Sequence, residues 1–471
     1  MPAEALAPAR RDPKSIDAAV RELTARFGNR VVTSRAVREQ HANTVTWIEN
    51  QPPDAVVFPQ STEEVQDIVR ICAKHRVPVI PFGTGTSLEG HVNAPFGGVS
   101  IDVRDMNKVL AVHAEDLDCV VQPGITRKAL NEYLRDQGVF FPIDPGADAS
   151  LGGMAATRCS GTNAVRYGTM KDNVLSLKVV LPDGELMTTA RRAKKSSAGY
   201  DLTRLMVGSE GTLGVITELT LKLSGIPEAI SGGICPFPSV EAGCNAAILT
   251  IQSGIPIARI ELLDALQVRA VNLYSKLTLR ETPMLFLEFH GTEAGVAEQS
   301  ERFGEIAREL GGGPFEWTTR PEERTWLWEA RHNAAFATFT LRPGSSMIPT
   351  DVCVPLSRLA ECVTETQRDI EESRLIAPIV GHIGDGNFHL TLLIDRDDPA
   401  EVANAKAFGE RLIQRALKMD GTCTGEHGVG QGKMKYLLSE HGPAALAAMR
   451  SIKRAFDPLD IMNPGKIVSL G

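Results

Sequence analysis

Residues 145–168 read PGADASLGGMAATRCSGTNAVRYG, a long stretch with few bulky side chains. Two shorter segments share this character: PFGTGTSLEG at 81–90, which follows an apolar strand, and GSEGTLGVIT at 208–217. Backbone N–H groups in such loops can converge on an anion. Segment 81–90 alone is equally compatible with a surface turn, because it is neither G-x-G-x-x-G nor a Walker A loop. Three such loops are entropically costly without a ligand. Together they predict a large, flat, multi-phosphate ligand, such as a dinucleotide with a tricyclic ring.

The overall composition is that of a folded protein. The chain has 471 residues, of which 43% are hydrophobic and 23% charged, so we expect two or three domains with sizeable cores. Its 50 basic and 58 acidic residues give a net charge of −8, which disfavours a nucleic-acid partner. No apolar run reaches the roughly 18 residues of a membrane-spanning helix. Peripheral membrane attachment stays open.

The cysteines and the N-terminal residues indicate where the protein works. The eight cysteines form no C-x-x-C pair, which argues against an iron–sulfur cluster and for reduced thiols in a cytosolic protein. The first residues, MPAEALAPARRDPKS, lack an apolar core and contain Glu4, so neither a secretory leader nor a mitochondrial presequence is expected. We therefore predict a cytoplasmic protein, with peripheral contact to the inner membrane as the open alternative.

Short strands alternate with helices along the chain. Around the first glycine loop we predict a strand at 54–60, a helix with a capping box of Ser61 and Glu64 that runs to about His75, and a strand at 77–83. These elements place the loop at the end of a buried strand.

The pattern shifts near 225–230, which suggests a domain boundary. We predict a first domain over 1–226, a second over 227–420, and a tail over 421–471 that returns to the first domain. The expected fold class is α+β. The second domain is predicted to contain strands at 230–236, 257–263, 284–290, 347–354, 376–382 and 388–394, and helices at 238–252, 293–310, 321–340 and 399–419.

The segment IVGHIGDGNFHLTLL at 379–393 predicts a metal site on a β-hairpin. Asp385-Gly386 is a strong signal for a two-residue turn between two apolar strands. That turn would pair His382 directly with His389, with Cβ atoms roughly 4.5–5.5 Å apart on one face. Two imidazoles at this spacing can hold one divalent ion. The alternative is a polar pair on a solvated sheet face, but the flanking glycines leave the face uncovered, which favours a cation.

The segment GTCTGEHGVGQGK at 421–433 can complete this site. Glu426 offers a third, anionic ligand. Its neighbour His427 points the other way in an extended backbone, so it is better placed as a base beside the metal. Two histidines and one carboxylate with open positions suit zinc, manganese or iron(II), and the residue types do not choose among them.

Two arginines and an asparagine are candidates for binding a substrate. Arg331 lies on the predicted helix in WLWEARHNAAFATFTLRPG, residues 326–344, and Arg342 lies at its end. An arginine fork matches a carboxylate in a bidentate way, although two exposed helix arginines are the simpler interpretation. Asn387, beside the hairpin turn, can add a donor. The segment NPGK at 463–466 can close over the predicted ligand.

The three glycine loops, in this order, resemble the FAD domain of the vanillyl-alcohol oxidase and p-cresol methylhydroxylase superfamily. The resemblance implies a two-lobed FAD-binding domain, with Gly83 to Ser87 at the pyrophosphate. Some relatives attach FAD through a histidine in the first loop; here His91 lies just past it, so noncovalent FAD is expected. The resemblance assigns cofactor contacts to Pro81, Gly83, Thr84, Gly85, Thr86, Ser87, Pro145, Gly146, Ser150, Gly152, Gly153, Gly161, Glu210, Gly211, Gly214, Ile216 and Asn463.

A second set of motifs narrows the resemblance. ARHN, TDVCVP, GHIGDGNFH, GTCTGEHG and MNPGK, in this order, resemble the D-lactate dehydrogenase (cytochrome) group from about residue 30 to the end. The resemblance implies an antiparallel-sheet cap that carries the substrate and the metal. It makes His382, His389 and Glu426 the metal ligands, His427 the catalytic base, and Arg331 a substrate-carboxylate residue.

The resemblance also implies a reaction and its partners. A small D-2-hydroxy acid such as D-lactate would be oxidised to the 2-keto acid by hydride transfer to FAD. Electrons would then pass to a separate acceptor, which is a cytochrome, a quinone or an electron-transfer flavoprotein. The sequence does not determine the oligomeric state, and a homodimer is one assembly that it leaves open.

Three alternatives stay open at this point. The first changes only the substrate, to D-2-hydroxyglutarate or to glycolate as in the flavin subunit of glycolate oxidase, and Arg342 could then bind a second carboxylate. The second is a zinc hydrolase built on His382, His389 and Glu426, which leaves the glycine loops unexplained. The third is a non-catalytic subunit of a larger flavoprotein.

Overall fold

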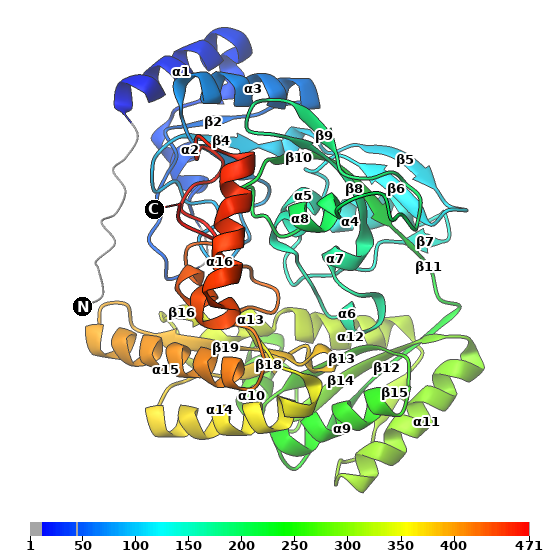
Figure 1. Ribbon diagram of the computed structural model, residues 1–471. Helices are drawn as coiled ribbons and strands as arrows, with labels where there is room; N and C mark the ends of the chain where they lie inside the picture. The colour runs from blue at the N-terminus through cyan, green and yellow to red at the C-terminus, as the bar shows by residue number, and fades with distance from the viewer. Residues whose placement is uncertain (1–11, 44–45, 471) are drawn as a thin grey trace.

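The computed structural model describes residues 12–43 and 46–470, and it has the predicted mixed α and β character (Figure 1). The upper part of the view holds the N-terminal half of the chain, and the lower part holds a large sheet with helices on it. The first 11 residues, most of the segment in which no leader is expected, lie outside the described residues. None of the described helices is long and apolar enough to cross a membrane.

The first sheet has the strand order β1-β2-β4-β3, and β2, β4 and β3 run parallel. The predicted helix after Ser61 is confirmed, and the Ser61 hydroxyl caps it by accepting the Glu64 N–H. The Glu64 carboxylate accepts from the Gln60 N–H instead of that of Ser61, so the reciprocal bond of the predicted capping box is absent. The elements are β1 (Val31–Val32), β2 (Ala55–Val57), β3 (Val79–Phe82), β4 (Val99–Asp102), α1 (Pro13–Phe27), α2 (Arg35–Gln40) and α3 (Thr62–His75).

The second sheet is antiparallel, with the order β5-β6-β10-β8-β9. The long glycine-rich segment 145–168 lies beside it and contains the short helices α5 and α6. The small residues of α5, LGGMAAT, let this helix pack closely against Pro123. The elements are α4 (Arg127–Leu134), α5 (Leu151–Thr157), α6 (Ala164–Tyr167), α7 (Met170–Asn173), α8 (Leu202–Met206), β5 (Val109–His113), β6 (Asp118–Val121), β7 (Val139–Phe140), β8 (Val174–Val180), β9 (Leu186–Thr188), β10 (Val215–Lys222) and β11 (Ser224–Gly225).

The third sheet has eight strands, all paired antiparallel, and forms the cap (Figure 1). Its order is β15-β12-β14-β13-β18-β19-β16, with β17 also paired to β19. The helices α9, α11, α14 and α15 lie below the sheet in this view. The elements are β12 (Ala229–Pro236), β13 (Ile257–Leu263), β14 (Met284–Gly291), β15 (Glu316–Thr318), β16 (Ser346–Pro349), β17 (Val352–Cys353), β18 (Ile379–Gly381), β19 (Asn387–Ile394), α9 (Val240–Gln252), α10 (Ala265–Ser275), α11 (Glu293–Glu309), α14 (Leu359–Ser373) and α15 (Pro399–Lys418).

Two predicted cap elements are interrupted. The helix expected over 321–340 ends at His332 as α12 (Pro321–His332), and is followed by α13 (Ala334–Ala337) and a 3-10 turn over Thr338–Leu341. The strand expected over 347–354 is split into β16 and β17. Thr350 and Asp351 lie in the gap between these two strands.

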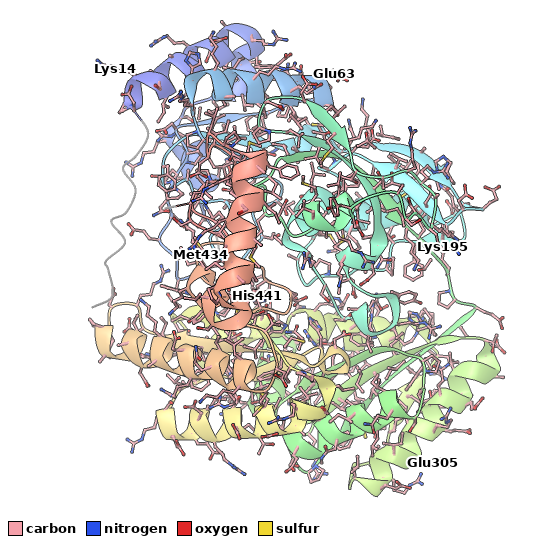
Figure 2. The ribbon with its side chains drawn as sticks, viewed as in Figure 1. Lys14, Glu63, Lys195, Glu305, Met434 and His441 are labelled. Carbon is pink, nitrogen blue, oxygen red and sulfur yellow. The ribbon has the colours of Figure 1, made fainter. Side chains whose placement is uncertain are left out.

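The C-terminal segment runs from the cap to the first sheet. Its helix α16 (Leu437–Phe456) is kinked at Gly442, where φ is +77° and Pro443 follows. Figure 2 places Met434 and His441 at the end of this segment nearest the cap. Further along, Met462 forms a parallel bridge with Val79 of β3 and is buried in the hydrophobic core around the first sheet. The domain limits 1–226, 227–420 and 421–471 stay predictions.

Candidate active site

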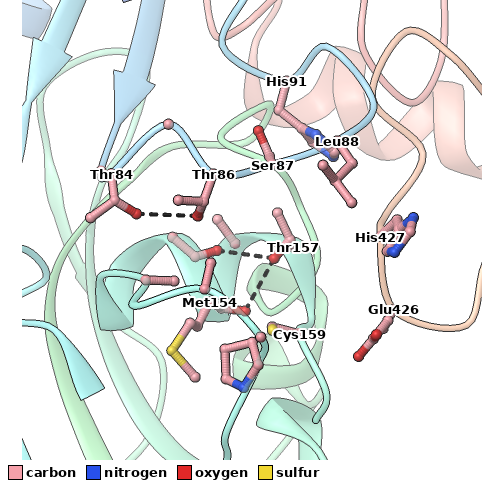
Figure 3. Close-up of a pocket in the computed structure, with 18 of the residues that line it drawn as sticks. Thr84, Thr86, Ser87, Leu88, His91, Met154, Thr157, Cys159, Glu426 and His427 are labelled. Carbon is pink, nitrogen blue, oxygen red and sulfur yellow. Dashed lines mark hydrogen bonds between the residues drawn. The ribbon is translucent and has the colours of Figure 1, made fainter. Parts of the chain in front are cut away.

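One cavity of about 710 Å³ joins the glycine loops to the cap. Figure 3 shows Thr84, Thr86 and Ser87 on one side of it and Glu426 and His427 on the other. Every predicted cofactor residue lines this cavity except Ser150 and Gly161. Most residues predicted for the flavin and all three predicted for the metal therefore line one cavity.

Glycine is required where the loops approach each other. A Cβ atom at Gly83 would overlap the Ser150 hydroxyl, and one at Gly161 would overlap the backbone of Asp144. Gly211 has a φ of +72°, and a Cβ there would meet the ring of Pro81. Ser150 and Gly161 thus shape the loops from behind the cavity wall instead of lining it.

Several buried polar atoms around the cavity lack a hydrogen-bond partner among the described residues. They include the hydroxyl of Ser87 and the Oδ1 atom of Asn463. Asn463 is held in place by its Nδ2 atom, which donates to the carbonyls of His91 at 3.1 Å and Glu210 at 2.7 Å. Unpaired buried polar groups are costly, so these atoms fit a polar ligand that would complete their hydrogen bonds.

Glu210 has another role besides lining the cavity. Its carboxylate accepts the backbone N–H groups of Val429 at 2.7 Å and Gly430 at 2.8 Å. The side chain predicted to contact the cofactor is thus already engaged with the C-terminal segment. It ties the loop that carries Glu426 and His427 to the glycine-loop domain.

The three predicted metal ligands converge in the structure. One ligand atom each of His382, His389 and Glu426 lies within 4.8 Å of the others. The Oε1 atom of Glu426 is 3.1 Å from Nε2 of His382 and 3.2 Å from Nε2 of His389. The Nε2 atom of His389 and Oε2 of Glu426 are buried, and neither has a hydrogen-bond partner among the described residues. This donor set fits a divalent cation.

The hairpin that carries the histidines differs from the predicted one. A 3-10 turn over Ile383–Asp385 makes the connection longer, and His389 lies opposite Val380 instead of His382. The register is therefore shifted by two residues, which keeps both histidines on the same face as diagonal neighbours. Their ring centroids are 5.4 Å apart. The predicted proximity is correct, but the predicted direct pairing is wrong.

His427 lies against the ligand cluster as a neutral imidazole. Its ring stacks on that of His389, with centroids 5.0 Å apart and planes 9° apart. Burial lowers the pKa of His427 to about 4, which outweighs the opposing effect of Asp351. A neutral imidazole that lines the cavity can accept a proton from a bound alcohol.

Arg331 reaches the cavity, but a carboxylate already binds it. Its Nε atom donates to Oε2 of Glu261 at 3.0 Å, and its Nη2 atom donates to the same oxygen. The other oxygen, Oε1 of Glu261, lies 2.8 Å from Nδ1 of His382. Arg331 is therefore not the free guanidinium that the sequence suggested.

Asn387 and Arg342 are predicted substrate contacts, and neither lines this cavity. The Nδ2 atom of Asn387 donates to Oδ1 of Asp351 and to the Val352 carbonyl, each at 2.8 Å. Arg342 forms an ion pair with Glu401 of α15. The break after His332 turns the end of the predicted helix away from the substrate side.

Asp351 organises the loop that follows the cap. Its Oδ2 atom accepts from the Thr424 hydroxyl at 2.8 Å and from the N–H groups of Glu426 and His427 at 2.9 Å each. Burial acts to raise the pKa of this carboxyl, but His427, Lys433 and nearby N–H groups outweigh it and hold the pKa well below its usual value. Asp351 is therefore a buried anion.

Sequence reasoning missed two functional carboxylates, Glu261 and Asp351. Glu261 is a single charged residue in the otherwise apolar strand 257–263, and it is fully buried. Asp351 interrupts the strand predicted over 347–354. An acidic residue inside an apolar strand was the available signal, because burial of such a group requires partners.

Comparisons with known proteins agree with this geometry. Residues 226–467 match the family described as FAD linked oxidases, C-terminal domain, and residues 53–190 match the family described as FAD binding domain. The chain is 52% identical to probable D-lactate dehydrogenase, mitochondrial, of Danio rerio, over 93% of this chain and 89% of that protein. It is 51% identical to D-lactate dehydrogenase [cytochrome], mitochondrial, of Arabidopsis thaliana, over 88% of this chain and 73% of that protein.

A more distant relative and a solved structure extend the comparison. The chain is 33% identical to glycolate oxidase subunit GlcD of Bacillus subtilis, over 88% of this chain and 89% of that protein. The crystal structure of p-cresol methylhydroxylase with substrate bound superposes with a TM-score of 0.80 at 18% identity, covering 98% of both chains. This structural likeness confirms the predicted fold.

Proposed function

The chain belongs to the FAD-linked oxidases, and we propose that it is an FAD-dependent dehydrogenase that oxidises D-lactate or similar small D-2-hydroxy acids to 2-keto acids. The observation that carries this proposal is the single cavity that joins the three glycine loops to His382, His389, Glu426 and His427. The D-lactate dehydrogenase names of relatives at 51–52% identity support the substrate, whereas the glycolate oxidase relative is only 33% identical.

The residues that would hold the two cofactors follow from the cavity wall. The glycine loops and Asn463 would hold FAD, which when bound supplies the acceptor for the hydride at C2 of the substrate. His382, His389 and Glu426 would hold a divalent cation (zinc, manganese or iron(II)), which when bound supplies a Lewis acid for the substrate hydroxyl. The unpaired buried atoms of Ser87, Asn463, His389 and Glu426 support these assignments.

The side chains of this protein then do three things. Glu261 occupies Nε and Nη2 of Arg331, and Arg331 presents its remaining nitrogen, Nη1, to the substrate carboxylate. His427 takes the hydroxyl proton onto a ring nitrogen, for which its neutral state prepares it. Apolar side chains of the wall, such as Val380, Met347 and Leu390, exclude water from the reacting atoms.

Electrons leave to a separate acceptor in this proposal. The name of the Arabidopsis thaliana relative favours a cytochrome in that role. The cytoplasmic location stays a prediction, and two of the relatives are named mitochondrial.

An anaerobic absorbance experiment tests the proposal. The purified protein is reconstituted with FAD, its metal content is measured, and spectra are recorded before and after D-lactate, with L-lactate as the control. Flavin bands that bleach only with D-lactate are the expected result. If flavin and metal are present and neither isomer bleaches the bands, D-lactate is the wrong substrate, and D-2-hydroxyglutarate and glycolate are the next to try. A protein that takes up no FAD would overturn the proposal as a whole.

A further inference from the structure

Glu261 is a carboxylate buried in the centre of the cap sheet. It lies on β13 between Ile260 and Leu262, and its side chain is inaccessible to solvent. Its carboxylate forms an ion pair with Arg331 and lies beside the imidazole of His382. The group is therefore an anion in an apolar sheet, a position that is costly unless both of its oxygens are well paired.

One partner of Glu261 is a proposed metal ligand. The Nδ1 atom of His382 lies 2.8 Å from Oε1 and 3.0 Å from Oε2 of Glu261. A carboxylate at this nitrogen holds the proton on Nδ1, so the opposite nitrogen, Nε2, is free to bind a cation beside Glu426. The contact fixes both the tautomer and the orientation of the ring.

The other partner is the proposed substrate arginine. Nε and Nη2 of Arg331 both donate to Oε2 of Glu261, which occupies one edge of the guanidinium. Within the described residues, Nη1 of Arg331 has no hydrogen-bond acceptor, and the residue lines the cavity. Because the guanidinium is planar, fixing one edge also fixes the direction of the free nitrogen.

We propose that Glu261 is a positioning residue that orients the metal-binding His382 and the substrate-binding Arg331 together. This inference rests on the proposed function. In the proposed reaction Glu261 touches neither the substrate nor a cofactor. It acts through the two side chains, so its loss changes metal affinity and substrate affinity at once.

Glu261→Gln is the sharpest variant. The amide keeps the size of the side chain and one acceptor oxygen, but its NH₂ group cannot accept a hydrogen bond. If the amide oxygen accepts from Arg331, the NH₂ group faces the Nδ1–H of His382, and the reverse orientation leaves Arg331 without its acceptor. We expect the affinity for added Zn²⁺ or Mn²⁺ to fall about 10- to 100-fold, as is usual when an outer partner of a metal ligand is lost. At saturating metal, the KM for D-lactate should rise about tenfold while kcat falls less, because a binding contact is weakened more than the chemical step.

Glu288→Gln is the matched control. Glu288 is equally buried on the neighbouring strand β14, where it pairs with His290 at 2.8 Å and Arg259 at 3.5 Å. It contacts none of the proposed site residues. This variant should keep the metal affinity and the KM of the wild-type protein. If Glu261 were only structural, both variants would lose stability and FAD alike, and neither would change KM at saturating metal.

The two parts of the test separate the inference from the proposed function. Metal titration of the FAD-loaded protein, followed by calorimetry, needs no turnover. Wild-type metal affinity in Glu261→Gln, or an unchanged KM at saturating metal, would overturn the inference. A wild-type protein that binds metal but leaves D-lactate untouched would instead refute the proposed substrate, while the metal titration would still report on Glu261.

Discussion

Asp351→Asn tests how the loop that carries Glu426 and His427 is held. The wild-type carboxylate accepts three hydrogen bonds on Oδ2, from the Thr424 hydroxyl and from the N–H groups of Glu426 and His427. Its Oδ1 atom accepts from the Asn387 amide. Asparagine keeps the shape but replaces one oxygen with an N–H donor, so one of the two sets of donors loses its acceptor.

The size of the effect follows from the number of bonds. A hydrogen bond to a charged group contributes about 1.5–3 kcal/mol, and a neutral one contributes about 1 kcal/mol. Removing the charge from three such bonds therefore costs about 1.5–6 kcal/mol, a range that includes the about 3–5 kcal/mol for breaking a buried ion pair. If about 3 kcal/mol of this is expressed as displacement of Glu426 and His427, flavin reduction slows by about 100-fold.

Stopped-flow absorbance measures this rate, with FAD and metal content determined on the same sample. Asp369→Asn is the control, because Asp369 pairs with Arg411 and Arg415 between two cap helices and does not line the cavity. The control should lower the melting temperature and leave flavin reduction at the wild-type rate. A wild-type rate of flavin reduction in Asp351→Asn would refute the positioning role of Asp351.

Four further changes test other parts of the site. His427→Ala should keep FAD but slow flavin reduction by about 10²- to 10⁴-fold, because the proposed general base is lost, and a fast stopped-flow trace would contradict this. Gly83→Ala should reduce FAD content, measured by absorbance, because the added methyl group overlaps the Ser150 hydroxyl, and adding Ser150→Ala should restore part of it. Arg342→Ala should leave the KM for D-lactate unchanged, because Arg342 pairs with Glu401 outside the cavity, and a raised KM in steady-state assays would show a substrate contact. Chelation should abolish D-lactate turnover without changing the flavin spectrum, and added zinc, manganese or iron(II) should restore it; full activity without metal would argue against the proposed ligands.

The glycine loops were predictable from sequence because their chemistry is local. A residue such as Gly83 must be small because another part of the chain or a ligand approaches its backbone closely, and a short run of small residues is enough to indicate this. The order of the three loops then identified the fold. The resemblance assigned a cofactor contact to Ser150, whereas Ser150 lies behind Gly83, because a sequence does not say which of two small residues faces the cavity.

The histidine pair was predictable for a different reason. Strand alternation keeps His382 and His389 on one face whether the register is the predicted one or is shifted by two residues. The longer turn at Ile383–Asp385 therefore changed the pairing without separating the rings.

Long-range partners could not be predicted. Glu261 and Asp351 come from segments far from the motifs, and only the folded sheet brings them to His382 and Glu426. The position of Arg342 also depends on the fold. On a continuous helix it would share a face with Arg331, eleven residues earlier, but the break after His332 turns it toward Glu401.

The position of Glu426 in the chain has a consequence for biosynthesis. The glycine loops at 81–90, 145–168 and 208–217 leave the ribosome early, so a nascent chain can fold its first two sheets and begin to shape the flavin cavity during translation. His382 and His389 follow with the cap, but the third ligand comes from a segment that must cross back over the finished sheet. In the proposed metal site the third ligand, Glu426, is therefore the last to be synthesised, so we expect the ion to bind only after the C-terminal segment has folded against the cap.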